Sequence, residues 1–351
     1  MDERAPRSPV LPWRTRPFPV DWALEFGRPC DLHLEIGFGD GRYTVRRALD
    51  EPAAGFVGLE ISSASVQRAL RRLRREGVPN VRLAKAGAQF ALRHLFAEHA
   101  LSTVVVNFPD PWPKERHTER RLLQRSFFRL AASRLRPGGA VRLATDHPVY
   151  LAFALAEARE AGSFQALETA PPAAVFETKY ALKWKAQGKP LHYVEFRYDG
   201  SPAAAFPHLE RATTMPHALF TGTLPPSAPF AKVVLPYGEG HVILHEVASS
   251  FGPPAGDASE RAHTPAEAAR AATANDDGSV RPRWWVRASV DEPDIRQHLL
   301  VLVQQRDARE VIVRLEPFGD PVITPTVRGA VHAVVAWLEA ATDLRLRERN
   351  Y

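Results

Sequence analysis

Residues 32–60 read LHLEIGFGDGRYTVRRALDEPAAGFVGLE, and this stretch decides the fold class. Its first five residues, Leu32 to Ile36, form an apolar run that predicts a buried strand. A glycine-rich turn follows at 37–41, then a predicted helix at 43–49 and a second predicted strand at 55–61. Strand, helix and strand in this order form a βαβ unit, which is typical of a parallel sheet.

The alternation of strands and helices continues to about residue 198. Further strands are predicted at 81–85, 103–107, 140–145 and 191–197, and further helices at 68–76, 89–99, 122–135 and 149–160. We therefore expect residues 1–200 to form an α/β domain with a mainly parallel sheet.

After residue 200 the composition changes, and we expect a smaller α+β domain at 201–351. Strand-like runs occur at 230–235, 241–247, 284–290, 298–304 and 311–316. One apolar stripe then predicts a final helix, with Val327, Val331, Val334, Val335 and Leu338 at helical spacing. Residues 251–282 are rich in Ala, Gly, Pro and Asp, and we interpret them as a mobile insertion.

Composition and charge exclude several classes of protein and favour one kind of partner. The 351 residues contain one cysteine, which excludes a disulfide framework and a multi-cysteine zinc site. No apolar run is long enough to span a membrane, and residues 1–16 lack a secretory apolar core, so we expect a cytoplasmic protein. Residues 1–200 carry 31 basic and 22 acidic residues, net +9, whereas 201–351 carry 15 and 18, net −3. The basic half favours a polyanionic partner such as nucleic acid.

A proline-rich loop follows the strand predicted at 103–107. Residues 107–122 read NFPDPWPKERHTERRL, and their three prolines exclude both helix and sheet at the start. The loop carries a carboxylate, an indole and an ammonium: Asp110, Trp112 and Lys114. A basic run follows, consisting of Arg116, His117, Arg120 and Arg121, and we expect it to contact phosphate. Because ligands bind beyond the carboxyl ends of strands in open α/β sheets, this loop is a candidate site.

The glycine-rich turn at 37–41 predicts a cofactor site. Gly37, Gly39 and Gly41 allow a close backbone approach, and Glu60 ends the next strand, where it can accept both hydroxyls of a ribose. Glu35 precedes the first glycine and would repel a dinucleotide pyrophosphate but attract a cationic amino acid. S-adenosylmethionine has an ammonium, a sulfonium and a ribose, and therefore suits these acids.

At this point the chain resembles the bacterial tRNA (guanine-N7)-methyltransferases over about residues 17–198. The resemblance is carried by the following motifs: Phe26-Gly27, Leu34 to Gly41, Gly58-Leu59-Glu60, the loop from Pro109 to Lys114 with Arg116-His117 and Arg120-Arg121-Leu122, Ala144-Thr145-Asp146, and Thr178-Lys179-Tyr180. The resemblance implies a Rossmann-like S-adenosylmethionine-dependent methyltransferase sheet. It also implies methyl transfer to N7 of a guanine in the tRNA variable loop, at position 46 of standard tRNA numbering.

The resemblance implies roles for individual residues. Glu35, Glu60 and Asp110 are expected to line the S-adenosylmethionine site, and Asp110 is the expected catalytic residue. Gly37, Gly39, Gly41 and Gly87 complete the cofactor set, while Lys114, Asp146, Thr178 and Lys179 are expected to contact the tRNA or its guanine. We expect no metal requirement, no membrane contact, no obligate protein partner, and a monomer or homodimer. Two positions depart from the pattern: Gly87 stands where many relatives have Asp, and Ala181 where they usually have Glu.

Other interpretations remain open at this stage. Asn107-Phe108-Pro109 is similar to the Asn-Pro-Pro-aromatic loop of amino methyltransferases, which favours another S-adenosylmethionine-dependent RNA methyltransferase. Gly87 and Ala181 favour a tRNA-binding protein that has lost catalysis. A dinucleotide-dependent dehydrogenase would use a similar glycine-rich turn and is the most distant alternative.

Overall fold

The computed structural model describes residues 8–212, 214–250 and 282–351, which divide into two compact units, Met1–Glu210 and Arg211–Tyr351. Nearly all of the insertion predicted at 251–282 lies outside the described residues. None of the helices in the described part has the length and apolarity needed to cross a membrane.

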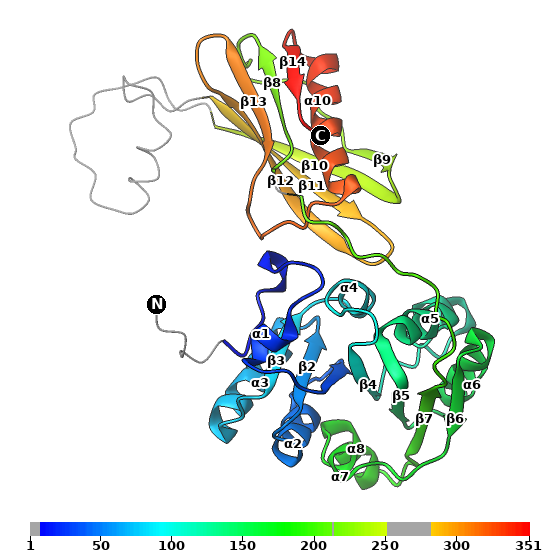
Figure 1. Cartoon of the computed structure of the whole chain (residues 1–351). Coiled ribbons are helices and arrows are strands. Elements are labelled where there is room, and N and C mark those ends of the chain that lie inside the picture. Colours follow the sequence, from blue (N-terminus) through cyan, green and yellow to red (C-terminus); the bar gives the residue numbers. More distant parts are fainter. Residues whose placement is uncertain (1–7, 213, 251–281) are drawn as a thin grey trace. The chain divides into compact units, whose positions relative to one another are not determined.

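The first unit is built on a seven-stranded sheet in the order β3-β2-β1-β4-β5-β7-β6 (Figure 1). Strand β7 is antiparallel to both of its neighbours, and every other pair is parallel. The strands are β1 (Leu32–Ile36), β2 (Gly55–Glu60), β3 (Val81–Lys85), β4 (Leu101–Asn107), β5 (Leu135–Thr145), β6 (Phe164–Leu167) and β7 (His192–Tyr198). The predicted α/β class with a mainly parallel, Rossmann-like sheet is confirmed.

Helices connect the parallel strands and bury one apolar face each. In α3, the residues Val66, Ala69, Leu70 and Leu73 are buried, while most of the arginines of the same helix are exposed. Ser62 caps its start and Gly77 ends it in the left-handed conformation. The helices are α1 (Trp22–Phe26), α2 (Arg42–Asp50), α3 (Ser63–Glu76), α4 (Ala88–His94), α5 (Arg125–Arg134), α6 (Pro148–Ala161), α7 (Ala173–Phe176) and α8 (Lys179–Ala186), with short 3-10 helices η1 (Trp13–Thr15) and η2 (Glu115–Arg120).

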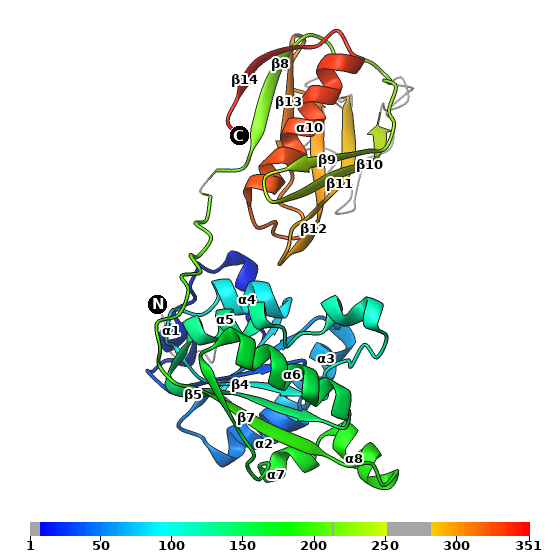
Figure 2. The same ribbon diagram turned by 90° about the vertical axis from the view of Figure 1, so that its right-hand side faces the viewer.

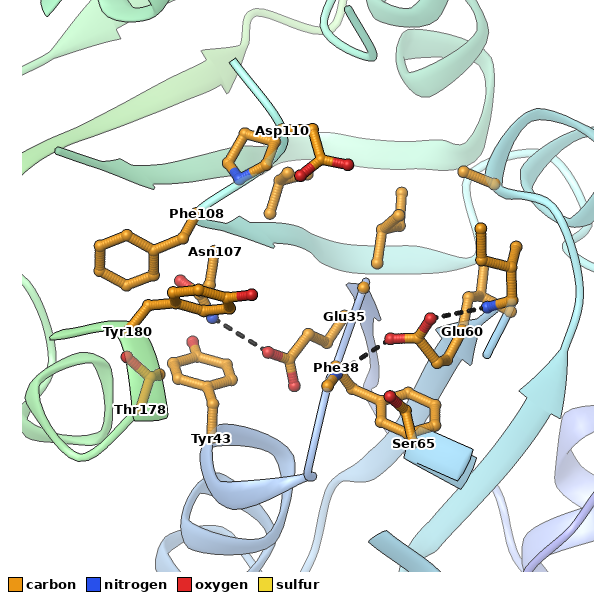
Figure 3. A pocket seen from close by; sticks show the side chains of 18 of the residues that line it. Glu35, Phe38, Tyr43, Glu60, Ser65, Asn107, Phe108, Asp110, Thr178 and Tyr180 are labelled. Carbon is orange, nitrogen blue, oxygen red and sulfur yellow. Dashed lines mark hydrogen bonds between the residues drawn. The ribbon is translucent and has the colours of Figure 1, made fainter. Parts of the chain in front are cut away.

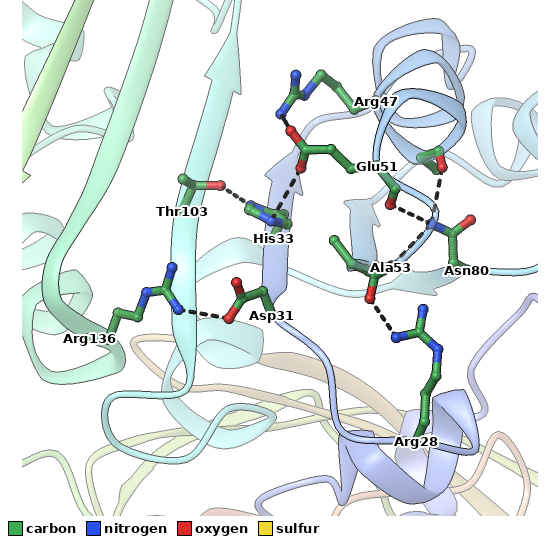
Figure 4. Close-up of polar contacts among 11 residues, drawn as sticks. Arg28, Asp31, His33, Arg47, Glu51, Ala53, Asn80, Thr103 and Arg136 are labelled. Carbon is green, nitrogen blue, oxygen red and sulfur yellow. Dashed lines mark hydrogen bonds and ion pairs between the residues drawn. The ribbon is translucent and has the colours of Figure 1, made fainter.

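The amino ends of these strands are closed by polar groups that have protein partners (Figure 4). His33 on β1 lies 2.8 Å from the Thr103 hydroxyl and 3.7 Å from Glu51, which in turn pairs with Arg47. The Asn80 side-chain amide donates to three main-chain carbonyls, those of Ala48, Glu51 and Ala54, at 3.0–3.2 Å. The polar groups at this end of the sheet therefore bond to other protein groups and stabilise the fold.

In its described residues, the second unit is an antiparallel sheet in the order β14-β8-β13-β12-β11-β10-β9, and helix α10 packs on it (Figure 2). The predicted stripe on that helix is fully buried, so the smaller α+β domain is confirmed. Trp284 lies on the buried face of β11, where its side chain packs in the same core and is 1% exposed. The elements are β8 (His217–Thr221), β9 (Val233–Tyr237), β10 (Gly240–Ser250), β11 (Arg283–Asp291), β12 (Arg296–Gln305), β13 (Glu310–Leu315), α10 (Pro325–Ala341) and β14 (Arg345–Arg349).

Candidate active site

A cavity of about 720 Å³ opens at the carboxyl ends of β1, β2 and β4 in the first unit (Figure 3). Parallel strands bring their carboxyl ends to one edge of the sheet, so loops distant in sequence meet there. Of the residues predicted from the sequence, the cavity wall contains Glu35, Gly37, Gly39, Glu60, Asp110, Arg120, Thr178 and Lys179.

The glycine-rich turn supplies one wall of the cavity. Gly37 and Gly39 have φ of 75° and 58°, which favours glycine, and a Cβ at either position would meet no atom within 4 Å. The space beside both residues is therefore open to a ligand. Gly41 is placed differently, because a Cβ there would lie 2.8 Å from the Ala69 side chain on α3. Gly41 thus allows α2 and α3 to pack closely and does not line the cavity.

Glu60 at the end of β2 is held by main-chain donors. Its Oε1 accepts from the N–H groups of Ile61 (2.9 Å) and Ser62 (3.0 Å), and its Oε2 accepts from the N–H of Gly39 (3.2 Å). These bonds tie the glycine-rich turn to the next strand and fix the carboxylate in the cavity wall. Gly87 lies nearby as the N-cap of α4, but its neighbours Ala86 and Ala88 line the cavity in its place.

Glu35 at the end of β1 is the buried acid of the site, at 5% exposure. Its carboxylate accepts from the side-chain amide of Asn107 (3.0 Å) and from the Thr44 hydroxyl. Burial raises the pKa of Glu35 to about 7, although the hydrogen bonds from Thr44 and Asn107 oppose this shift. The carboxylate is therefore poised to ionise fully when a cation enters the cavity.

The proline loop leaves β4 in a strained but well-anchored conformation. Phe108 and Trp112 have φ of 51° and 40°, which side chains other than glycine rarely adopt. The Phe108 N–H donates to the Ala144 carbonyl (2.8 Å), and the Arg121 guanidinium donates to the carbonyls of Pro111 and Trp112 (both 3.1 Å). Arg121 is only 7% exposed, so its position fits a clamp on this loop and does not fit the predicted phosphate contact.

The charged groups of the loop are exposed. Asp110 lines the cavity and makes no hydrogen bond or ion pair with any residue that the structure describes. Arg120 also lines the cavity, with its guanidinium 5.1 Å from the centre of the Trp112 ring. Lys114, Arg116 and His117 lie outside the cavity on or next to η2, where Lys114 and Arg116 are exposed. The basic run is therefore a 3-10 helix beside the cavity mouth, with Arg121 turned inward.

The predicted substrate residues near β5 and α8 separate in space. Asp146 is outside the cavity wall and lies 3.7 Å from the Lys189 ammonium. Thr178 caps α8 by accepting from the Ala181 N–H (3.1 Å), and the Ala181 side chain is buried. Lys179 is exposed at the cavity mouth. Among the described residues, no cluster of His, Cys, Asp or Glu is arranged to hold a metal ion.

Many wall residues were not predicted as site residues from the sequence, and four of them gather at one end of the cavity. Tyr43, Asn107, Phe108 and Tyr180 lie at the end of the cavity opposite Glu60 (Figure 3). Tyr43 carries no motif signal beyond its place next to the glycine turn, whereas Tyr180 ends the Thr178-Lys179-Tyr180 motif, which could have pointed to it. Asn107 and Phe108 open the proline loop, and their position directly after a predicted strand is the signal that could have found them.

Comparison with known proteins extends these observations. A family model described as "Putative methyltransferase" matches residues 30–194, which include the whole cavity wall. The chain is 40% identical to a tRNA (guanine-N(7)-)-methyltransferase of Thermus thermophilus over 331 residues, covering 94% of this chain and 96% of that protein. It is 37% identical to the Deinococcus radiodurans protein of the same name, covering 91% and 92%. A Thermotoga maritima protein of that name is 35% identical over 59% of this chain and 66% of its own length.

Proposed function

The chain belongs to the tRNA (guanine-N7)-methyltransferase family, and we propose that it methylates N7 of a guanine in the variable loop of tRNA. The observation that carries this proposal is the cavity at the carboxyl ends of β1, β2 and β4, where Glu35, Glu60 and Asp110 meet. These are the acids that the family motifs place around S-adenosylmethionine. The Thermus thermophilus and Deinococcus radiodurans proteins of this name align with 94% and 91% of the chain and so extend over both units.

The cavity fits S-adenosylmethionine. Open space beside Gly37 and Gly39 leaves room for a ligand against the main chain, and Glu60 is fixed where a ribose would offer its hydroxyls. Glu35 is a buried acid that a ligand ammonium would neutralise. When bound, S-adenosylmethionine would supply an electrophilic methyl group for the guanine N7 lone pair, and its sulfur would keep the electron pair of the broken carbon–sulfur bond.

Asp110 is the group that we assign to the reacting base. Guanine N7 carries no hydrogen, so the protein needs no general base and must instead orient the ring. The base gains positive charge during transfer, and a carboxylate fixed near it stabilises that charge. Asp110 sits between two prolines on a loop that Arg121 clamps, and it has no competing partner among the described residues.

Exposed cations around the cavity mouth suit the tRNA backbone. Lys114, Arg116, Arg120 and Lys179 are all exposed and lie on η2, on its flanks or at the start of α8. They would contact phosphate without carrying sequence information. We propose the cytoplasm as the location because tRNA is the substrate, and a monomer or homodimer stays a prediction.

The direct test is methylation of a tRNA transcript followed by nucleoside analysis. The expected product is N7-methylguanosine, whereas N6-methyladenosine would favour an amino methyltransferase. A matched transcript with 7-deazaguanine at the target position lacks N7 and should accept no methyl group. If the protein binds S-adenosylmethionine in calorimetry but methylates neither transcript, its activity lies on another substrate. If it binds tRNA but no S-adenosylmethionine, it is a binding protein.

A further inference from the structure

The cavity has two chemically different ends (Figure 3). One end contains Glu60 and the open space beside the glycine turn, and the other is walled by the rings of Phe108, Tyr180 and Tyr43. Glu35 lies between the two ends. We propose that the aromatic end is a stacking slot for the target base, an inference that rests on the proposed function and assigns a stacking role to Tyr180 and Phe108.

Tyr180 forms the outer wall of this slot. It is 48% exposed, which is unusual for a large aromatic side chain on a cavity wall, and its ring centre lies 6.1 Å from that of Phe108. Its place is determined by the N-cap of α8, because the Thr178 hydroxyl accepts from the Ala181 N–H and donates to the Val175 carbonyl. The ring therefore projects from a fixed helix start and keeps free apolar surface for a ligand.

Phe108 packs against Tyr180, so that the two rings form one continuous aromatic wall, and it holds this place at an energetic cost. Its φ of 51° is strained for a residue with a side chain, yet the main-chain bond to Ala144 and the following proline hold it there. In this conformation the ring points toward Tyr180 at the cavity wall. Strain of this kind at a cavity is expected where a side chain is aimed at a ligand.

Polar groups lie at the edge of the slot that faces Glu35. Asn107 donates to Glu35, which orients its amide and leaves its Oδ1 buried with no hydrogen-bond partner among the described residues. The Tyr43 hydroxyl likewise makes no hydrogen bond with a described residue, although the ring itself is 4% exposed. A base stacked on Tyr180 would bring its ring donors and acceptors to these two side chains.

Stacking would help the reaction and not only the binding. Aromatic faces carry negative electrostatic potential and attract a cation above them. A purine methylated at N7 is positively charged, so its stacking with Tyr180 and Phe108 strengthens as the charge develops. An interaction that is stronger in the transition state than in the ground state raises the rate.

Tyr180→Leu is the informative variant and Tyr180→Phe its matched control. We expect Tyr180→Leu to lower the single-turnover rate of methyl transfer at least tenfold, while the dissociation constant for S-adenosylmethionine, measured by calorimetry, changes less than threefold. Tyr180→Phe keeps the aromatic face and should stay within twofold of the natural protein in both. A loss of cofactor affinity as large as the loss of rate would assign this end to the cofactor and overturn the slot.

A second measurement does not depend on activity. In NMR titrations without cofactor, 7-methylguanosine monophosphate should bind at least fivefold more tightly than guanosine monophosphate, and Tyr180→Leu should abolish that preference. Equal affinities in the natural protein, or a preference that survives in Tyr180→Leu, would contradict the slot. If the natural protein forms N7-methylguanosine while Tyr180→Leu is unaffected, the slot fails and the proposed function stands. If the natural protein forms none, the proposed function itself fails.

Discussion

Strand β1 carries one ionisable group near each end, a partly buried histidine and a buried glutamate, and the protein uses the two in opposite ways. His33 near the amino end and Glu35 near the carboxyl end are two residues apart and therefore project from the same side of the strand. Burial lowers the pKa of His33 to about 4 and raises the pKa of Glu35 to about 7, so burial disfavours the charged form of both. The neutral imidazole of His33 lies within hydrogen-bond distance of the Thr103 hydroxyl, in a cluster of polar protein groups. The carboxyl group of Glu35 faces an open cavity.

The difference separates a structural end from a functional end of one sheet. At the amino end, Asn80 and Arg47 use their donors on protein acceptors, and the sheet gains a rigid base. At the carboxyl end, Asp110 has no partner among the described residues and Phe108 is strained. A carboxylate without a protein partner is available to a ligand, and a strained main chain lowers the stability of the fold. The rigid base keeps them in position.

The largest effect is expected from Asp110→Ala at the carboxyl end. We expect methyl transfer to fall about 10²–10³-fold, because the charge that develops on the base loses its fixed carboxylate. The melting temperature should stay unchanged, since Asp110 is exposed and bonds to no described residue. Initial rates with labelled cofactor and a thermal melt measure both. Activity within threefold of the natural protein would show that Asp110 is not central.

Glu35→Gln should weaken binding of S-adenosylmethionine about 100-fold, because a buried ammonium would lose its ionised partner. In the natural protein, affinity should rise as pH increases toward the Glu35 pKa of about 7 and level off above it, and the variant should lose this dependence. Calorimetry at pH 5.5, 6.5 and 8 gives both quantities. A pH-independent affinity in the natural protein would exclude Glu35 as the ammonium partner.

Although Glu35→Gln should weaken cofactor binding, it should make the cofactor-free protein more stable. The folded pKa of Glu35 lies above its ordinary value of 4.5, so ionisation in the folded state costs stability as pH rises from about 4.5 through 7. Without cofactor, Glu35→Gln should therefore gain stability relative to the natural protein between pH 5 and pH 8, by on the order of 3 kcal/mol. Denaturant unfolding at the two pH values checks the sign, and an unchanged difference would contradict it.

A matched pair of asparagines tests the two ends directly. Asn80→Ala removes a buried amide that satisfies three carbonyls and should cost about 1–3 kcal/mol of unfolding free energy, with cofactor affinity unchanged. Asn107→Ala removes the donor to Glu35 and should weaken cofactor binding, with a smaller cost in stability. If both variants lose mainly stability, the division between the two ends is wrong.

The smallest effect concerns two adjacent arginines. Arg120→Ala should reduce the slope of log affinity for tRNA against log salt by about one, since one exposed phosphate contact is lost. Arg121→Ala should leave the slope unchanged and lower the melting temperature, because its guanidinium holds the proline loop. Filter binding of tRNA at several salt concentrations distinguishes the two variants. An equal change in the salt slope for both would show that Arg121 also contacts phosphate.

Local patterns were sufficient for much of the fold. The β-branched and apolar runs predicted β1 and β3 to the residue, and the glycine turn indicated where the cavity lies. The strands β6, β8 and β14 were missed. The four residues of β6 and the five of β8 are too few to show an alternation, and the residues of β14 are mostly charged. The prediction of a helix from residue 122 was early by three residues, since α5 begins at Arg125.

The sequence by itself determined which acids gather in the cavity: Glu35, Glu60 and Asp110 each follow or end a parallel strand, and parallel strands end at one edge. Only the tertiary structure decided that Arg120 is exposed while Arg121 is buried, and that Tyr43 and Tyr180 lie together at the end of the cavity away from Glu60. It also decided the raised pKa of Glu35. The physical reason is that periodicity is local, whereas burial and charge environment depend on atoms that the fold brings from distant segments.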